Sequence, residues 1–103
     1  MNKNHYHLVI YPSAQNDLLE VKDYFENKLK ITPNKLFQKF YDSLDLLESN
    51  PFIHPLISDV YLEQLGYRMY AVDNFLVFYV IENDEIQIHR FLYGKRNYSL
   101  ILK

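Results

Sequence analysis

The sequence contains no cysteine, which excludes a disulfide framework and a thiolate metal site. It also lacks any uninterrupted apolar run near the ~20 residues of a membrane-spanning helix, and its first residues, MNKNHYH, lack the hydrophobic stretch of a signal peptide. The histidines His5, His7 and His54 do not have the spacing of metal ligands. We therefore expect a cytoplasmic protein with no membrane contact, no metal and no cofactor.

An excess of basic residues is missing too. The chain has 11 Lys and Arg against 13 Asp and Glu, a net charge of −2 with histidine neutral. Proteins that bind nucleic acid by neutralising phosphates usually carry a basic excess, because these contacts supply most of the affinity. The composition therefore argues against general nucleic-acid binding and leaves room only for a local basic patch.

Hydrophobic and aromatic residues, by contrast, are abundant. They make up 49% and 17% of the chain, which excludes a disordered protein. A chain of 103 residues is long enough to bury one core without disulfides. We expect a single domain over residues 1–103.

The densest run of β-forming residues lies between positions 67 and 98, where Val, Ile, Tyr and Phe dominate. Asp73-Asn74 and Asn83-Asp84 interrupt this run, and Asn and Asp tolerate the left-handed backbone of tight hairpins. The stretch FLVFYVI is apolar throughout, which is typical of a strand inside a sheet. The pattern predicts an antiparallel meander of three strands, Tyr67–Val72, Phe75–Ile81 and Glu85–Tyr93.

The N-terminal part predicts a strand followed by a helix. Over His5–Tyr11 the side chains alternate between two sides, Tyr6, Leu8 and Ile10 on one and His7, Val9 and Tyr11 on the other, which favours a strand. Ser13 is a suitable N-cap for a helix that begins at Ala14, and apolar residues then recur at helical spacing. The helix is expected to end at about Lys30.

A second helix follows after a short connection. Thr32 is a suitable N-cap and Pro33 suits the first helical position, where its missing N–H is harmless. Asn50 and the proline after it end the helix, so the two helices should form an antiparallel hairpin. Residues 51–66 are expected to form a loop with a short extended segment. Ser99–Lys103 are expected to form a short apolar tail.

The predicted element order is β-α-α-β-β-β, which indicates an α+β fold with one curved four-stranded sheet. Two amphipathic helices can cover one face of that sheet and leave the other face open. An open face with aromatic and basic side chains is where we expect the functional site.

The turns assign side chains to the two faces. With Asn83-Asp84 as a two-residue turn, Ile81 lies opposite Ile86 and Phe78 opposite His89, whereas a slip of one residue would invert the faces. The predicted core face holds Val77, Tyr79, Ile81, Ile86 and Ile88. The predicted open face holds Leu76, Phe78, Val80, Gln87, His89 and Phe91.

The first hairpin decides where Arg68 and Tyr70 lie. A three-residue turn, Val72-Asp73-Asn74, places both beside His89 on the open face, and a two-residue turn sends them to the helix side. Burial of an unpaired guanidinium is costly, which favours the three-residue turn.

Arg90 falls on the core face in this register. There it is expected to contact a carboxylate of the first helix, Asp17 or Glu20, as a structural ion pair.

Several stretches together resemble the RelE/ParE superfamily of small bacterial toxins from type II toxin–antitoxin modules. They are YPSAQNDLLEVKDYF, NPF with the proline that follows, GYRMYAVDNFLVFYVI and IQIHRFLYGKRNYSLIL. The resemblance spans nearly the whole chain and implies a microbial-RNase-like fold. It also implies a cognate antitoxin as partner, with operator DNA bound only through that antitoxin.

The superfamily divides by target, and the resemblance implies different site residues for each branch. RelE-like members cut messenger RNA on the ribosome without a metal, whereas ParE-like members act on DNA gyrase. Arg68 and Arg96 match basic positions of the RelE-like site. Tyr70 stands where a second lysine would be, and Leu76 stands where RelE-like relatives carry arginine, which resembles the ParE-like form.

Two chemical hypotheses therefore stand beside each other. For metal-free RNA cleavage, Arg68 and Arg96 would stabilise charge, His89 would act as base or acid, and Tyr70 would stack on a base or donate a proton. For a toxin that acts by binding, the expected contacts to the target or antitoxin are Phe78, Phe91, Tyr93, Lys95 and Tyr98. The missing arginine and the acidic net charge favour binding to gyrase, and a non-toxic antitoxin-binding relative is the third alternative.

Antitoxin recognition is the partner interaction that we expect on any of these hypotheses. A disordered antitoxin segment can fold as it binds and so cover a large surface. We expect it on exposed apolar and aromatic residues of the first helix, the second helix or a sheet edge.

Overall fold

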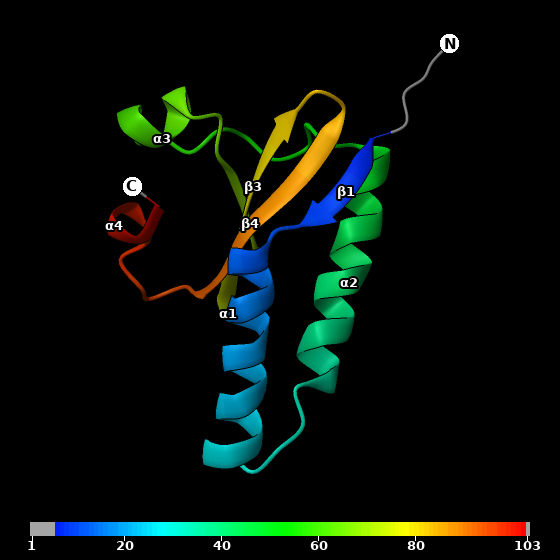
Figure 1. Ribbon diagram of the computed structural model, residues 1–103, viewed down its shortest axis with the longest axis vertical. Helices are drawn as coiled ribbons and strands as arrows, with labels where there is room; N and C mark the ends of the chain where they lie inside the picture. Colours follow the sequence, from blue (N-terminus) through cyan, green and yellow to red (C-terminus); the bar gives the residue numbers. More distant parts are fainter. Residues whose placement is uncertain (1–5, 103) are drawn as a thin grey trace.

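The computed structural model describes residues 6–102. Helices α1 and α2 stand against one side of a curved sheet and extend beyond its lower end (Figure 1). In chain order the elements are β1 (His7–Ile10), α1 (Pro12–Asp23), a π-helical turn η1 (Tyr24–Lys28), α2 (Asn34–Ser49), α3 (Val60–Gln64), β2 (Arg68–Val72), β3 (Phe75–Glu82), β4 (Glu85–Tyr93) and α4 (Tyr98–Leu102).

The four strands form one mixed sheet in the order β1-β4-β3-β2. β2, β3 and β4 make the predicted antiparallel meander, and β1 pairs in parallel with the first half of β4. The α+β fold class with one curved four-stranded sheet is therefore confirmed. His5, which the sequence placed in the first strand, and Lys103, placed in the tail, lie outside the described residues.

Both hairpins of the meander have two-residue turns. Asn83 and Asp84 adopt positive φ angles of 53° and 64°, which gives the predicted pairing of Ile81 with Ile86. The three-residue turn predicted for the first hairpin is wrong, because Val72 pairs with Phe75 and only Asp73-Asn74 lie between them. The odd number of residues in the expected turn inverted the faces of β2.

A β-bulge in β4 inverts the expected faces a second time. Tyr79 pairs with Ile88 and Phe78 pairs with Arg90, so His89 is the extra residue. The prediction that Phe78 lies opposite His89 is therefore wrong. Beyond the bulge, Phe91 packs in the core under the helices, although the sequence placed it on the open face.

Helix α1 begins at Pro12, two residues before the predicted start at Ala14. Pro12 occupies the first turn and Tyr11 is the N-cap, so Ser13 is inside the helix. The Ser13 hydroxyl instead donates a hydrogen bond of 2.6 Å to the carbonyl of His89. At its other end the helix continues as the turn η1, so it approaches the predicted end at Lys30.

Helix α2 begins at Asn34, whose backbone N–H donates to the Thr32 hydroxyl at 3.2 Å. Its predicted end is confirmed, because Asn50 is the C-cap. Its apolar stripe packs on the sheet and forms the main core with α1. The buried residues of this core are Ala14, Leu36, Phe40, Leu44, Leu47, Val72, Val77, Tyr79, Ile86, Ile88 and Phe91.

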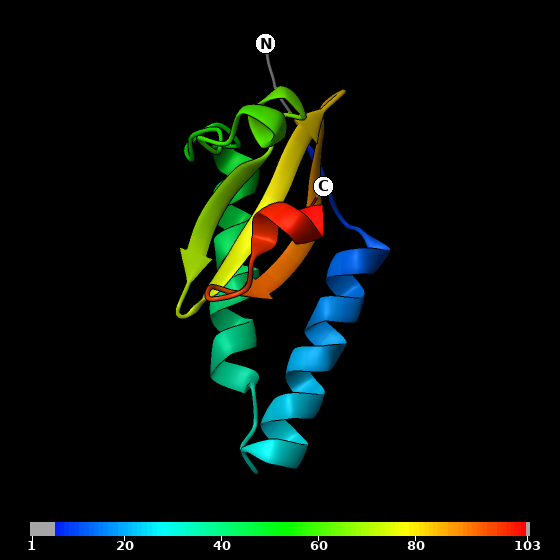
Figure 2. The ribbon, with the colours of Figure 1, turned by 90° about the vertical axis from the view of Figure 1, so that its left-hand side faces the viewer.

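The second face of the sheet, which the sequence predicted to be open, is covered (Figure 2). The segment predicted as a loop contains α3, and the predicted tail forms α4, which lies across this face. They close a second core of Ile57, Leu62, Tyr67, Phe78 and Leu92. Short apolar segments gain burial by covering apolar strand residues, and periodicity cannot reveal helices of five residues.

Among residues 6–102, no helix is long and apolar enough to cross a membrane.

We expect Tyr79→Phe to lower the free energy of unfolding by about 1–2 kcal/mol. The buried Tyr79 hydroxyl donates to the carbonyl of Pro51 at 2.9 Å, and its loss leaves that carbonyl without its hydrogen bond. Urea unfolding measures the change. Tyr93→Phe is the control, because its side chain is exposed, and an equal loss in both variants would contradict this account.

Candidate functional site

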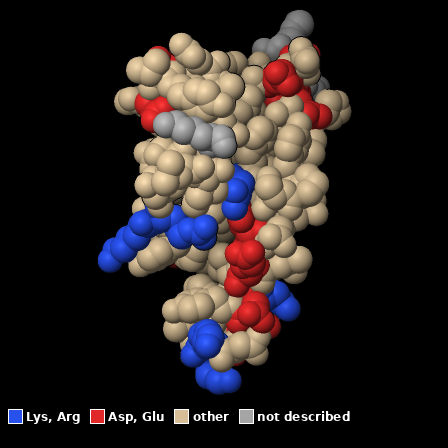
Figure 3. Space-filling model, turned by 60° about the vertical axis from the view of Figure 1, so that its left-hand side comes forward, with Lys and Arg blue, Asp and Glu red and all other residues tan. Residues whose placement is uncertain are grey.

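Charged side chains are unevenly distributed over the surface. Acidic residues recur along α1 and η1, and two basic residues, Lys95 and Arg96, follow the end of β4. Figure 3 shows a run of acidic side chains down the lower part of one face, with basic side chains on either side of it. A site with both signs of charge can therefore form where α1 approaches the end of β4.

The four residues that the sequence suggested for catalysis do not converge. Arg68 lies on the helix side of β2, paired with Tyr79. Its guanidinium donates a hydrogen bond of 2.6 Å to the carbonyl of His54 and lies 5.1 Å from the ring centre of Phe52. These contacts hold the connection between α2 and β2 against the sheet, and they remove the burial cost that argued against this side.

Tyr70 also lies on the helix side, with its hydroxyl 2.7 Å from that of Ser43. Its ring stacks on the ring of His54, with centroids 4.5 Å apart. Burial raises the pKa of Tyr70 to about 12. The hydroxyl is therefore a poor proton donor at neutral pH and is engaged within the core layer.

His89 lies on the opposite face from these two residues. Its Nδ1 is 2.9 Å from the Tyr67 hydroxyl, its Nε2 is 3.1 Å from Gln87 Oε1, and its ring stacks on Tyr11. Because the Gln87 amide nitrogen donates to Glu85, the Gln87 oxygen is the acceptor for His89 Nε2–H, and Nδ1 accepts from Tyr67. The neutral ring thus has both nitrogens paired, and burial lowers the pKa of His89.

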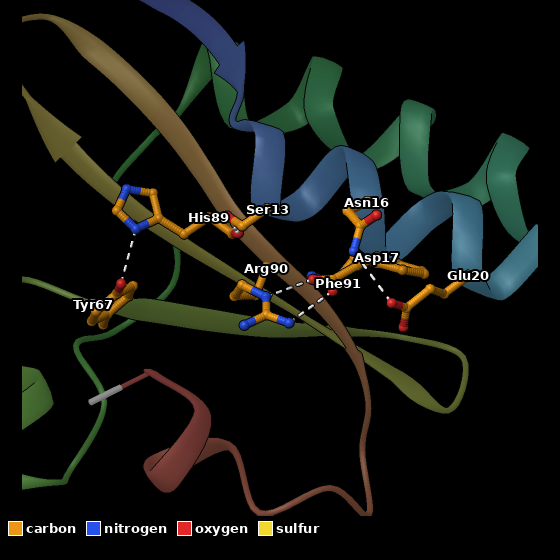
Figure 4. A network of polar contacts seen from close by, with 8 residues as sticks. All are labelled: Ser13, Asn16, Asp17, Glu20, Tyr67, His89, Arg90 and Phe91. Carbon is orange, nitrogen blue, oxygen red and sulfur yellow. Dashed lines mark hydrogen bonds and ion pairs between the residues drawn. The ribbon is translucent and has the colours of Figure 1, made fainter.

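Arg90 pairs with Asp17, one of the two carboxylates expected from the sequence. Its predicted place on the core face is wrong, because the bulge puts it opposite Phe78 of the second core. Arg90 Nε and Nη2 donate to the two Asp17 oxygens at 2.7 and 2.8 Å, and the backbone N–H of Phe91 donates to Asp17 at 2.9 Å. Figure 4 shows Arg90 directed to α1 and His89 directed away from it to Tyr67. The hydrogen bonds that Arg90 donates to Asp17 raise the pKa of Arg90.

Two of the five predicted contact residues are not at the surface. Phe78 and Phe91 are 0% and 1% exposed, because the second face is covered and the bulge turns Phe91 into the core. Tyr98 is partly buried on Phe78, with ring centroids 5.0 Å apart. Tyr93 and Lys95 are exposed, as a binding surface requires.

A groove of about 640 Å³ lies between α1 with η1 and the end of the meander. One wall is the helix and the other contains the turn before β3, the end of β4 and Arg96. We call it the helix–strand groove. It is lined by Asp17, Glu20, Val21, Tyr24, Phe25, Leu29, Asn74, Phe75, Phe91, Leu92, Tyr93 and Arg96.

Sequence reasoning found part of this groove. It selected Asp17, Phe91, Tyr93 and Arg96 as single residues, and it expected a partner on apolar residues of the first helix. It missed Tyr24 and Leu29, which line the groove and are 54% and 44% exposed. The apolar stripe of the first helix could have indicated them, because it continues beyond the part of the helix that packs on the sheet.

No three His, Cys, Asp or Glu side chains gather into a possible metal site within the part of the chain that the structure describes. The candidate site is therefore an apolar groove with acidic and basic groups at its walls, suited to binding a protein segment.

Comparison with known proteins gives one family and one fold. A family model described as the ParE toxin of the type II toxin–antitoxin system, parDE, matches residues 8–98. A solved structure titled "Chromosomal ParDE TA system from P. aeruginosa" is 19% identical, with a TM-score of 0.71, covering 90% of this chain and all of that one. No curated protein matches the sequence.

We expect Asp17→Ala to lower the free energy of unfolding by about 3 kcal/mol, because it leaves Arg90 and the Phe91 N–H without their acceptor. Urea unfolding measures this loss. Glu20→Ala, one turn further along α1 and exposed, is the control and should change stability little. Equal losses in the two variants would contradict a central role for Asp17.

His89 should make stability depend on pH. Because burial lowers its pKa in the folded state, its contribution is full above about pH 6.5 and is lost as pH falls through the folded pKa. We expect the unfolding free energy to fall between pH 7.5 and 5.5, and His89→Gln to reduce that slope. Burial also lowers the pKa of His54, so the double variant should lose more of the slope. An unchanged slope in His89→Gln would exclude this linkage.

Proposed function

The chain belongs to the family of ParE toxins of type II toxin–antitoxin systems, and from this membership we propose that it arrests growth by binding DNA gyrase and that a cognate antitoxin neutralises it. Its action would be binding to the target, with no hydrolysis by the toxin itself. The observation that carries this choice is that the four residues that could have formed a ribonuclease site lie at three separate places.

Metal-free cleavage of RNA needs a base, an acid and a charge stabiliser around one phosphate. Here Arg68 and Tyr70 are held on the helix side by His54 and Ser43. His89 is on the other face, paired with Tyr67 and Gln87, and Arg96 lies at the helix–strand groove. No two of the three positions share a surface, which supports binding over hydrolysis.

Two further features agree with this proposal. Leu76, at the position where the resemblance to RelE-like toxins would require arginine, packs against the second core. Loss of one preorganised donor typically lowers the catalytic rate by ~10²–10³, so the absence of this arginine weakens the ribonuclease alternative. The net charge of −2 also supplies little general attraction for RNA.

The helix–strand groove supports the antitoxin as partner. Tyr24, Leu29 and Tyr93 line one recess, and each is at least 43% exposed. Exposed apolar side chains gathered in this way are typical of a surface that binds another protein. The P. aeruginosa relative carries a title that names a ParDE toxin–antitoxin system, and we propose a corresponding pair for this chain.

Induction of the toxin without antitoxin should stop growth and accumulate cleaved DNA–gyrase complexes. Purified toxin added to gyrase and supercoiled plasmid should give linear DNA after denaturation with detergent and protease digestion. Co-expression of the antitoxin is the control and should restore growth.

Arrested translation with codon-phased cuts in messenger RNA and normal plasmid topology would overturn the gyrase proposal. If alanine at Arg68 and at Arg96 then abolished those cuts, the ribonuclease alternative would be established. Normal growth with abundant folded toxin would instead identify a non-toxic antitoxin-binding relative.

A further inference from the structure

The connection between α1 and α2 lies at one end of the longest axis of the molecule, beyond the sheet (Figure 1). Residues 28–35, which contain this connection, include three exposed lysines and no acidic residue. These lysines are Lys28, Lys30 and Lys35, and none of them forms an ion pair with residues 6–102. We call residues 28–35 the basic tip.

The charges next to the basic tip do not cancel it. Lys22 pairs with Glu26 at 3.5 Å. Lys39 pairs with Asp73 at 2.9 Å. Asp23 is the only other acid between positions 22 and 39. The tip therefore keeps an excess of positive charge in a chain whose net charge is −2.

Two residues distinguish the basic tip from an ordinary charged turn. Lys30 has a φ of 58°, in the left-handed region where glycine is the usual residue just after a helix. Ile31 is 54% exposed and is not among the residues that line the helix–strand groove. The tip thus presents an apolar side chain beside its lysines, outside the groove.

The other end of the longest axis carries the opposite charge. The segment from α2 to α3, α3 itself and the turn between β3 and β4 lie at this end (Figures 1 and 2). We call residues 52–65 and 82–84 the acidic end. Its exposed carboxylates Glu63, Glu82 and Asp84 form no ion pair with residues 6–102. Figure 3 shows basic side chains at the lower end of the molecule and acidic side chains at the upper end.

The acidic end also exposes apolar side chains. Phe52, Ile53, Val60 and Leu65 are between 46% and 75% exposed. The basic residue beside them, Arg68, is engaged by the His54 carbonyl at 2.6 Å. Several exposed apolar side chains in one part of a surface are typical of a site that binds another protein.

The two ends complement each other in charge, and both carry exposed apolar side chains. A second copy of the chain, shifted along the longest axis, brings its lysines to the carboxylates of the first copy. Two basic tips repel each other, and so do two acidic ends, which disfavours a symmetric dimer through either surface. A contact between two different surfaces leaves one of each free, so it continues from copy to copy.

We propose that the chain associates end to end with further copies of itself, through the basic tip of one copy and the acidic end of the next. Ile31 packs among the apolar side chains of the acidic end, and the lysines of the tip face Glu63 and Glu82. The described residues extend over 48 × 30 × 21 Å, which limits the contact to roughly 600 Å² per copy. Such an area is at the low end of specific interfaces and corresponds to a dissociation constant of roughly 10⁻⁵–10⁻³ M.

Sedimentation equilibrium of the full chain in low salt measures this association between about 10 µM and about 1 mM. The average mass should rise with concentration, pass that of a dimer and fall toward that of one chain in high salt, because salt screens the charges. A mass that stays at one chain over this range would overturn the proposal. A mass that stops at a dimer would overturn the end-to-end arrangement.

Charge reversal at each end identifies the surfaces. The tip variant, Lys30→Glu with Lys35→Glu, and the end variant, Glu63→Lys with Glu82→Lys, should each weaken self-association at least about tenfold. A mixture of the two should associate again, because the intact tip of one variant meets the intact acidic end of the other. Failure of the mixture to associate would contradict the pairing of these surfaces.

Asp42→Lys is the control for the end variant, since Asp42 is exposed on α2 and belongs to neither end. It should change self-association less than about twofold. Lys30→Gly removes one charge and suits the positive φ, so it should keep or raise thermal stability and still weaken self-association about threefold. An unchanged association in this stable variant would exclude Lys30 from the contact.

Ile31→Ser tests the apolar part of the contact, with Leu19→Ser as the matched control. Leu19 is 64% exposed on α1 and belongs to neither end. Ile31→Ser should weaken self-association about tenfold and Leu19→Ser less than about twofold, with circular dichroism confirming that both variants fold. Equal effects would exclude Ile31 from the contact.

Nucleic acid is the other partner that a basic tip could take. If a labelled DNA duplex bound the wild type and not the tip variant, while the wild type remained a single chain, the tip would be assigned to DNA and the proposal overturned. The proposal does not depend on gyrase as target, so a failure to inhibit gyrase would leave it intact.

Discussion

The buried Asp17 carboxylate is the contact on which the arrangement of this protein depends. It accepts two hydrogen bonds from Arg90 and one from the backbone of Phe91, and so joins α1 to β4 across 73 and 74 positions of sequence. Together with Ser13 it caps the side of β4 that the short β1 leaves unpaired. A helix takes the place of a longer edge strand, which protects the sheet from further pairing at that edge.

This substitution of helix for strand also creates the helix–strand groove. Because α1 is fixed to β4 near its own N-terminal half, its second half and η1 extend beyond the sheet (Figure 1). The apolar side chains there, Tyr24 and Leu29, have no strand to cover and remain exposed. The contact that stabilises the fold therefore also determines where an uncovered apolar surface remains for a partner.

Both faces of the sheet are covered, so the candidate site lies at the rim of the sheet. α1 and α2 cover one face, and α3 and α4 cover the other. Two side chains of the strands that could take part in catalysis instead make contacts within the fold. Arg68 holds the connection between α2 and β2, and His89 joins β4 to the residue before β2 through Tyr67. These side chains therefore stabilise the fold, and the exposed groups that remain lie at the rim of the sheet.

The sequence by itself determined the strand meander and the two long helices, because alternation, helical spacing and Asn-Asp turns are local signals. For Arg90 it predicted a carboxylate of the first helix as partner and left Asp17 and Glu20 as alternatives. It could not determine which side chains point to which face of the sheet beyond the first hairpin turn and the β-bulge. The two-residue turn at Asp73 and the bulge at His89 each shift the side-chain alternation by one position, and which alternative is adopted depends on whether Arg68 and Arg90 find partners far away in the chain. The groove likewise required tertiary structure, since its walls meet only after α1 docks on β4 and η1 turns Leu29 inward.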